Sequence, residues 1–205
     1  MSTYPTADLI LSAAHARQFP PDVGVEVAFA GRSNSGKSSA INAITNKHGL
    51  ARTSKTPGRT RLLNFFQLAP GCRIVDLPGY GYAEASAAER ATWVPMTTAL
   101  AQRASLHGLF LMIDSRRGVQ EGDEGLLEWA ADAGCEIHVL LTKVDKLRHA
   151  ELTAALKEAR KQLGARATVQ AFSASDRTGV EDARRQLHRW FQAEPATDRP
   201  PQSAS

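Results

Sequence analysis

The glycine-rich segment Gly31-Arg32-Ser33-Asn34-Ser35-Gly36-Lys37-Ser38 organises the rest of this chain. It matches the pattern G-x-x-x-x-G-K-[ST], and it joins a strand-like run at 25–30 to a helix-like run at 38–44. Such a loop points consecutive backbone N–H groups into one concavity, and the N-terminus of the following helix adds partial positive charge. We therefore expect it to hold the phosphates of a nucleotide. Lys37 would reach the β- and γ-phosphates, and the Ser38 hydroxyl would bind Mg²⁺.

Length and composition are those of one globular domain with tails. The formal net charge of +4 permits an anionic partner such as RNA without requiring one. Cys72 and Cys135 stand in or beside apolar runs without C-x-x-C or histidine spacing, so we expect reduced, structural cysteines and no zinc site. The chain has no signal-peptide pattern and no apolar run of membrane-spanning length, so we predict a cytoplasmic protein.

Strand-like and helix-like runs alternate along the chain. Strands are predicted at 25–30, 62–68, 72–77, 109–114, 137–141 and 168–172. Helices are predicted at 37–46, 87–105, 121–133, 151–163 and 180–191, and Pro95 should kink or split the second of them. This alternation predicts an α/β fold, with a mostly parallel six-stranded sheet, one antiparallel edge strand, and helices on both faces. Residues 1–22 are predicted to be an N-terminal extension, 23–193 the domain, and 194–205 a disordered tail.

Two further motifs follow predicted strands, where ligands bind in sheets of this kind. The first is Asp76-Leu77-Pro78-Gly79. Asp76 can hold Mg²⁺ through water, and the Gly79 N–H can contact the γ-phosphate, so the loop after it would sense that phosphate.

The second motif, Thr142-Lys143-Val144-Asp145, is expected to select the base. The Asp145 carboxylate can accept hydrogen bonds from N1–H and the 2-amino group of guanine, and adenine offers neither donor there. The Lys143 stem can lie across the base. Thr142 stands where the usual guanine motif has asparagine, which predicts weaker bracing between loops. After the last predicted strand, the Ala174 N–H is expected to bond guanine O6.

The polar loop at 53–61 is predicted to be a switch, since a threonine there can close on Mg²⁺ and the γ-phosphate. Thr60, which directly precedes a predicted strand, is preferred over Thr56. A solvated basic loop is the alternative.

Together these motifs resemble the TrmE-Era-EngA-EngB group of GTPases, and most closely the EngB family. The resemblance covers roughly residues 23–191 and is carried by 31–39, 54–60, 76–83 and 142–145; Thr142 is shared with that family. It implies a Ras-like P-loop GTPase fold, so that 23–193 would be a GTPase domain hydrolysing GTP to GDP and phosphate.

The resemblance also implies the residues of the site. Mg²⁺ is expected at Ser38 and Thr60, and Lys37, Thr60 and Gly79 are expected to act in catalysis. Asn34 would bind K⁺ or, alternatively, only brace the loop. The implied GTP-binding residues are Gly31, Arg32, Ser33, Asn34, Ser35, Gly36, Lys37, Ser38, Gly58, Arg59, Thr60, Arg61, Leu62, Asp76, Leu77, Pro78, Gly79, Thr142, Lys143, Val144, Asp145, Phe172, Ser173 and Ala174.

Tyr80 stands where Ras-type enzymes place the glutamine that orients the attacking water. Slow intrinsic hydrolysis is therefore expected, with K⁺, an RNA or ribosomal group, or a residue supplied in trans as activator. A monomer is expected. The resemblance implies a protein that acts in assembly of the large ribosomal subunit and is needed for normal cell division and septation. Two other interpretations are a nucleotide-gated binding module at the division site, with incidental hydrolysis, and, less favoured, a nucleoside kinase.

We expect any RNA contact to come from the domain itself, because the 205 residues leave no room for a separate RNA-binding module. A solvated basic surface is the alternative for every candidate. Tyr80 and Tyr82 could stack on a base or on a partner in one nucleotide state. The candidate cations are Lys55, Arg59, Arg61, Arg116, Arg117, Arg184, Arg185 and Arg189.

Overall fold

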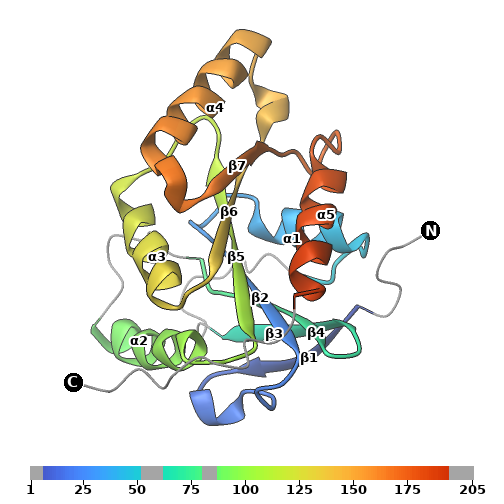
Figure 1. The fold of residues 1–205 in the computed structure, drawn as a ribbon, viewed down its shortest axis with the longest axis vertical. Coiled ribbons are helices and arrows are strands. Elements are labelled where there is room, and N and C mark those ends of the chain that lie inside the picture. Colours follow the sequence, from blue (N-terminus) through green and yellow to red (C-terminus); the bar gives the residue numbers. More distant parts are fainter. Residues whose placement is uncertain (1–6, 52–61, 80–86, 194–205) are drawn as a thin grey trace.

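The computed structural model describes residues 7–51, 62–79 and 87–193, without the side chains of 87–92. A seven-stranded sheet in the order β1-β3-β4-β2-β5-β6-β7 forms its centre, and helices cover both faces (Figure 1). The strands are β1 (Asp8–Ala13), β2 (Val25–Gly31), β3 (Leu63–Ala69), β4 (Cys72–Asp76), β5 (Leu106–Asp114), β6 (Glu136–Thr142) and β7 (Thr168–Ala171). The helices are α1 (Lys37–Thr45), α2 (Ala87–Ala101), α3 (Glu121–Asp132), α4 (His149–Leu163) and α5 (Val180–Phe191), with short 3-10 helices η1 (Ala16–Gln18), η2 (Val144–Lys146) and η3 (Gly164–Arg166).

The predicted α/β class is confirmed, but the strand count is seven rather than six. The additional strand is β1, which pairs antiparallel with β3 and forms the edge of the sheet. The predicted antiparallel strand therefore lies inside the sheet, between β1 and β4. The sequence signal for β1 is weak because the pairing register shifts between Leu9 and Leu11, while Leu9 and Ile10 are exposed. The second predicted helix is not split, since α2 continues through Pro95.

Strand β2 is buried along its whole length and has a parallel partner on each side. Strands β4 and β5 follow each other as strands along the chain, but they lie on opposite sides of β2. The strand order therefore changes direction at β2. In open α/β sheets such a switch point opens a crevice at the carboxyl ends of the strands. The segments that follow β2, β4 and β6 at this edge are the phosphate loop and the two motifs predicted above.

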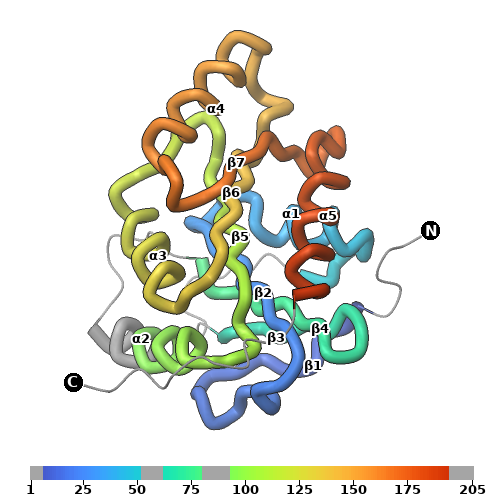
Figure 2. Tube along the Cα trace, viewed as in Figure 1, coloured from blue at the N-terminus to red at the C-terminus, as the bar shows by residue number. Residues whose placement is uncertain are grey.

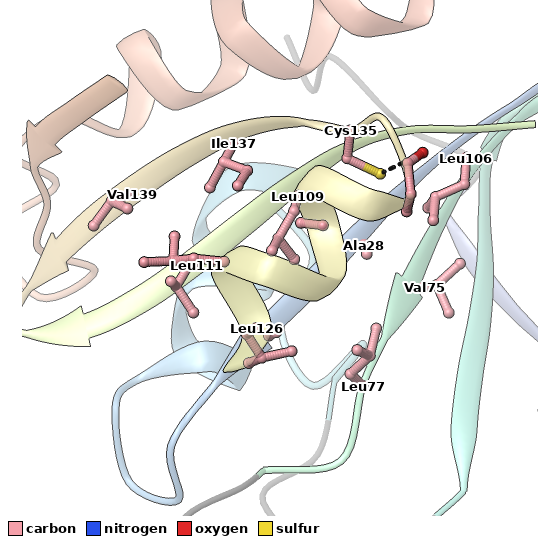
Figure 3. Packing of buried hydrophobic residues seen from close by; sticks show 14 of the residues in the cluster. Ala28, Val75, Leu77, Leu106, Leu109, Leu111, Leu126, Cys135, Ile137 and Val139 are labelled. Atoms are coloured by element: carbon pink, nitrogen blue, oxygen red, sulfur yellow. Dashed lines mark hydrogen bonds between the residues drawn. The ribbon is translucent and has the colours of Figure 1, made fainter. Parts of the chain in front are cut away.

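Two hydrophobic cores hold the layers together, one on each face of the sheet. Helices α1 and α5 pack beside each other on one face, as the trace in Figure 2 also shows. Helices α2, α3 and α4 cover the other face, where Leu126 of α3 belongs to the same buried cluster as Leu109 and Leu111 of β5 (Figure 3). Burying one such leucine side chain contributes about 1.5–3 kcal/mol, so this packing fixes the frame of the site. Cys72 and Cys135 are not joined in a disulfide, and Cys135 is buried in the core on this face of the sheet.

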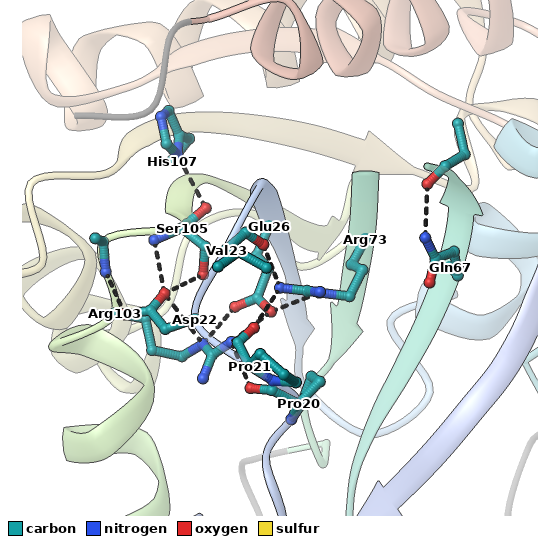
Figure 4. Close-up of polar contacts among 12 residues, drawn as sticks. Pro20, Pro21, Asp22, Val23, Glu26, Gln67, Arg73, Arg103, Ser105 and His107 are labelled. Atoms are coloured by element: carbon teal, nitrogen blue, oxygen red, sulfur yellow. Dashed lines mark hydrogen bonds and ion pairs between the residues drawn. The ribbon is translucent and has the colours of Figure 1, made fainter. Parts of the chain in front are cut away.

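The opposite end of β2 carries a buried ionic network (Figure 4). Glu26 is fully buried and accepts hydrogen bonds from Arg73 Nε at 2.9 Å and Arg103 Nε at 2.6 Å. Both guanidinium groups also donate to the Pro21 carbonyl. The network therefore joins the segment before β2 to the start of β4 and to the segment after α2.

Candidate active site

The phosphate loop has the backbone geometry that its glycines predict. Asn34 and Gly36 are left-handed, with φ of 65° and 93°. A Cβ atom at Gly31 would lie 2.4 Å from Ser35 Oγ and 2.8 Å from the Met112 carbonyl oxygen, so only glycine fits. The loop closes with a hydrogen bond from the Ser35 N–H to the Arg32 carbonyl (2.9 Å) and leads directly into α1.

Lys37 and Asp76 form an ion pair that joins the first turn of α1 to the end of β4. Their side chains are only 12% and 7% exposed, so each charge depends on the other for compensation. Ser38 is the next residue of α1, and its hydroxyl and the Asp76 carboxylate are oxygen donors of the type that Mg²⁺ prefers. The residues present therefore fit a Mg²⁺ ion bound partly by nucleotide phosphates.

Gly79 lies against the phosphate loop. A Cβ atom added to it would be 3.0 Å from Ser33 Oγ and 3.4 Å from Ser33 N. The Asp76–Gly79 motif thus meets the phosphate loop at Ser33, the residue before Asn34, and a larger side chain at Gly79 would press on Ser33.

Thr142 braces the phosphate loop. Its hydroxyl donates to the Ser35 carbonyl at 2.5 Å, and the Ile113 carbonyl lies 3.2 Å away. Thr142 is 2% exposed, so water does not compete for these contacts. A brace between β6 and the loop is therefore present, because β6 is close enough to the loop for a short hydroxyl to make the connection. That this brace is weaker than one made by asparagine stays a prediction.

Asp145 is held in an ionised state. Lys146 Nζ lies 2.9 Å from Oδ2, and Ser173 Oγ donates to Oδ1 at 2.8 Å. The hydrogen bond from Lys146 and then that from Ser173 lower the pKa of Asp145. An ionised carboxylate is an acceptor only, which is what the N1–H and 2-amino donors of guanine require.

The sequence did not identify Asp114 as a site residue, and it indicated Arg116 only as a candidate for RNA contact. Asp114, at the end of β5, is 8% exposed and receives Lys143 Nζ at 2.9 Å. Arg116 grips the same carboxylate through Nε at 2.9 Å and Nη2 at 2.7 Å, and these contacts hold the pKa of Asp114 well below its usual range. Lys143 also donates to the Asn34 carbonyl. The only sequence signal was a carboxylate at a strand end near this loop.

A cavity of about 290 Å³ lies between the phosphate loop and the loop after β5. Its wall includes four cationic side chains and two carboxylates, so the neighbourhood of the phosphate loop is electropositive. The lining residues are Arg32, Ser33, Asn34, Ser35, Met112, Ile113, Asp114, Arg116, Arg117, Gly118, Gln120, Asp123 and Lys143.

The structure describes some of the remaining predicted residues and not others. Leu77, Val144 and Phe172 bury their side chains in the cores, so only their main-chain atoms are available to a ligand. Leu62 directly precedes β3 and is partly buried. Outside the described residues lie Lys55, Thr56, Gly58, Arg59, Thr60, Arg61, Tyr80 and Tyr82.

Most described basic candidates for RNA contact have partners within the fold. Arg184 is mainly structural, since its side chain is 11% exposed and donates to the carbonyls of Ile44 (2.7 Å) and Ala43 (2.8 Å) at the end of α1. Arg185 pairs with Asp182, and Arg189 pairs with Glu136. These pairs depend on contacts across a helix turn or between elements, which a list of basic residues does not reveal.

Helix α4 carries a different set of cations, here called the α4 basic face: Lys157, Arg160 and Lys161. All three are exposed, and within the described residues none forms an ion pair. No helix in the described ranges is long and apolar enough to cross a bilayer.

The chain is similar in sequence to known proteins. A family model described as "50S ribosome-binding GTPase" matches residues 26–143. A protein from Coxiella burnetii named probable GTP-binding protein EngB is 46% identical over 196 residues, which cover 94% of this chain and 96% of the relative.

Two solved structures have the same fold. One is that of a probable GTP-binding protein engB, with a TM-score of 0.65 and 19% identity; the alignment covers 82% of this chain and 99% of that one. The other is Era in complex with MgGDPNP and a segment of 16S ribosomal RNA, with a TM-score of 0.61 and 18% identity; here the alignment covers 86% of this chain and 60% of that one. The chain belongs to the EngB family of GTP-binding proteins, and it is a GTPase with the P-loop GTPase fold.

Proposed function

We propose that this GTPase is a cytoplasmic, monomeric switch whose GTP-bound form acts in assembly of the large ribosomal subunit, and that cell division and septation depend on it. The observation that carries the proposal is the match of residues 26–143 to a family model described as a 50S ribosome-binding GTPase. The Era structure, in which a GTPase of the same fold is bound to ribosomal RNA, is consistent with RNA as the contacted surface.

The proposed nucleotide site uses the contacts described above. Lys37 exchanges the Asp76 carboxylate for the β- and γ-phosphates, because phosphate oxygens offer it the same charge complementarity. Ser38, Thr60 and, through water, Asp76 would hold Mg²⁺, which when bound offsets the charge of the phosphate oxygens. Asp145 and the Ala174 N–H recognise guanine. Gly79 lies against Ser33, so we expect a γ-phosphate bound in the loop to change the conformation of the segment that follows Gly79.

Hydrolysis by the free protein is proposed to be slow, because Tyr80 cannot orient water as glutamine does. Asn34 is proposed to bind K⁺, which would add positive charge beside the phosphates. Measuring phosphate release in KCl and in NaCl of equal ionic strength tests this point. Equal rates in the two salts would show that the Asn34 amide only braces the loop.

The α4 basic face is proposed to contact phosphates of ribosomal RNA. Its three members lie at helical positions i, i+3 and i+4, so they share one side of α4, while Leu152, Leu156, Ala159 and Leu163 pack against the sheet. Cations without acidic partners are free to neutralise phosphates, whereas Arg185 and Arg189 would first have to leave theirs.

Co-sedimentation with isolated large subunits, in a GTP analogue and in GDP across a salt series, tests the proposal. Binding in the analogue that weakens with salt is expected. The variant K157A/R160A/K161A should weaken binding and reduce the slope of log affinity against log salt by about two to three. R166A/R185A/R189A is the matched control, because it removes the same charge from residues that each have a carboxylate partner.

Equal losses in the two variants would show a non-specific charge effect and exclude the α4 basic face. Absence of binding in both nucleotide states would remove the ribosomal role and leave the GTPase activity standing. The division-site binding module would then be the preferred function.

A further inference from the structure

Arg116 and Asp114 form a bidentate ion pair, here called the fork, which the proposed function above does not use. Two side-chain bonds, of 2.9 and 2.7 Å, run from the guanidinium to the two carboxylate oxygens, and the Arg116 N–H adds a third contact to Oδ1 at 3.1 Å. A bidentate arginine fixes the plane of a carboxylate as well as its charge. Arg116 is 49% exposed, so water screens part of the ion pair, but Asp114 is nearly buried.

The fixed carboxylate has a second partner. Oδ2 of Asp114 receives Lys143, and the same ammonium donates to the carbonyl of Asn34 in the phosphate loop. Lys143 also has a left-handed backbone, with φ of 60°. A non-glycine residue keeps such a conformation only where surrounding contacts hold it. The contacts thus form a chain from Arg116 through Asp114 and Lys143 to Asn34.

We propose that Asp114 and Arg116 are positioning residues for nucleotide binding. They hold Lys143, a member of the guanine motif, against the phosphate loop, so that both halves of the site keep their relative position before the nucleotide arrives. The proposal rests on the proposed contact of Lys143 with guanine nucleotide. A pre-organised site loses less conformational freedom on binding, and the gain appears mainly as slower release.

Two other roles of the fork are possible outcomes of a test. Arg116 could merely stabilise the turn after β5, in which case its removal would lower the melting temperature without changing nucleotide release. It could instead contact RNA, as the sequence analysis suggested, and then the free protein would release nucleotide normally. The fork assigned here predicts the opposite pattern for Arg116→Ala: faster release with little change in melting temperature.

The experiment measures release of mant-GDP from the full-length protein after addition of excess unlabelled GDP. Arg116→Ala should make release about threefold faster, and Asp114→Asn about tenfold faster, as expected for loss of partly exposed charge-assisted hydrogen bonds. Arg166→Ala is the matched control, because Arg166 is 48% exposed and also pairs with a carboxylate, that of Glu124, outside the chain of contacts that runs from Arg116 to Asn34. It should release GDP at the wild-type rate.

Wild-type release rates in both Arg116→Ala and Asp114→Asn would overturn the inference. Should Asp114→Asn fold poorly in a thermal melt, Arg116→Ala decides alone, since its side chain is half exposed. Asp145→Asn, measured in parallel, tests the proposed guanine site separately. Normal release in Asp145→Asn with fast release in Arg116→Ala would refute the assigned base contact and still support positioning by the fork.

Discussion

Thr142→Val is the sharpest test of how the two halves of the site are joined. Threonine and valine have nearly the same shape, so the substitution removes the hydroxyl and little else. In the wild type this hydroxyl lies 2.5 Å from the Ser35 carbonyl and 3.2 Å from the Ile113 carbonyl. Both Thr142 and Ser35 are almost fully buried, at 2% and 3% exposure, so water cannot replace the lost donor.

The magnitude follows from that burial. A buried acceptor that loses its donor costs about 1–3 kcal/mol in the free energy of unfolding. A domain of this size loses about 2–4 °C of melting temperature for each kcal/mol, so a decrease of about 2–12 °C is expected. The affinity for GDP should also fall, because the phosphate loop loses its link to β6.

The assay combines thermal melts with GDP titrations of the wild type, Thr142→Val and Thr142→Ser. Serine keeps the hydroxyl and loses only a methyl group, so Thr142→Ser should retain the wild-type affinity for GDP. A Thr142→Val protein that melts within about 1 °C of the wild type and binds GDP equally well would refute the argument.

Three further predictions concern stability. Glu26→Gln removes the buried carboxylate that Arg73 and Arg103 share, and urea denaturation should show a loss of about 3 kcal/mol in the free energy of unfolding. A loss below about 1 kcal/mol would contradict the network. Arg184→Ala should lower the free energy of unfolding by about 1–2 kcal/mol, because the last carbonyls of α1 lose their donor, and co-sedimentation with large subunits should stay unchanged. Reduced co-sedimentation with normal stability would instead support an RNA contact by Arg184. Asp114 has a pKa below its ordinary 3.8, so its contribution to the free energy of unfolding is full above about pH 5 and is lost as the pH falls through the folded-state pKa. The difference in stability between wild type and Asp114→Asn should therefore shrink in acid, and a difference independent of pH would disprove this linkage.

The local motifs could be read from the chain because their chemistry lies in contiguous residues. The phosphate loop needs glycines, a lysine and a serine at fixed spacing, and in the fold Gly36 has a left-handed backbone, which glycine adopts readily. The alternation of strands and helices likewise predicted a largely parallel sheet, because side-chain periodicity reports burial directly. Strand β1 was missed since its exposed Leu9 and Ile10 and its register shift obscure that periodicity.

Only the folded structure shows which partners the charged and polar side chains contact. Arg184 and Ile44 are 140 residues apart in the chain, yet their contact turns a candidate RNA-binding arginine into a helix cap. The same holds for Thr142, whose short hydroxyl braces the loop because β6 brings it within 2.5 Å of Ser35. Residue type and spacing are properties of the chain, and they determined the fold class and the nucleotide motifs. Distances between elements depend on how the layers pack, and therefore the three-dimensional arrangement alone assigned Asp114, Arg116, Thr142 and Arg184 their partners.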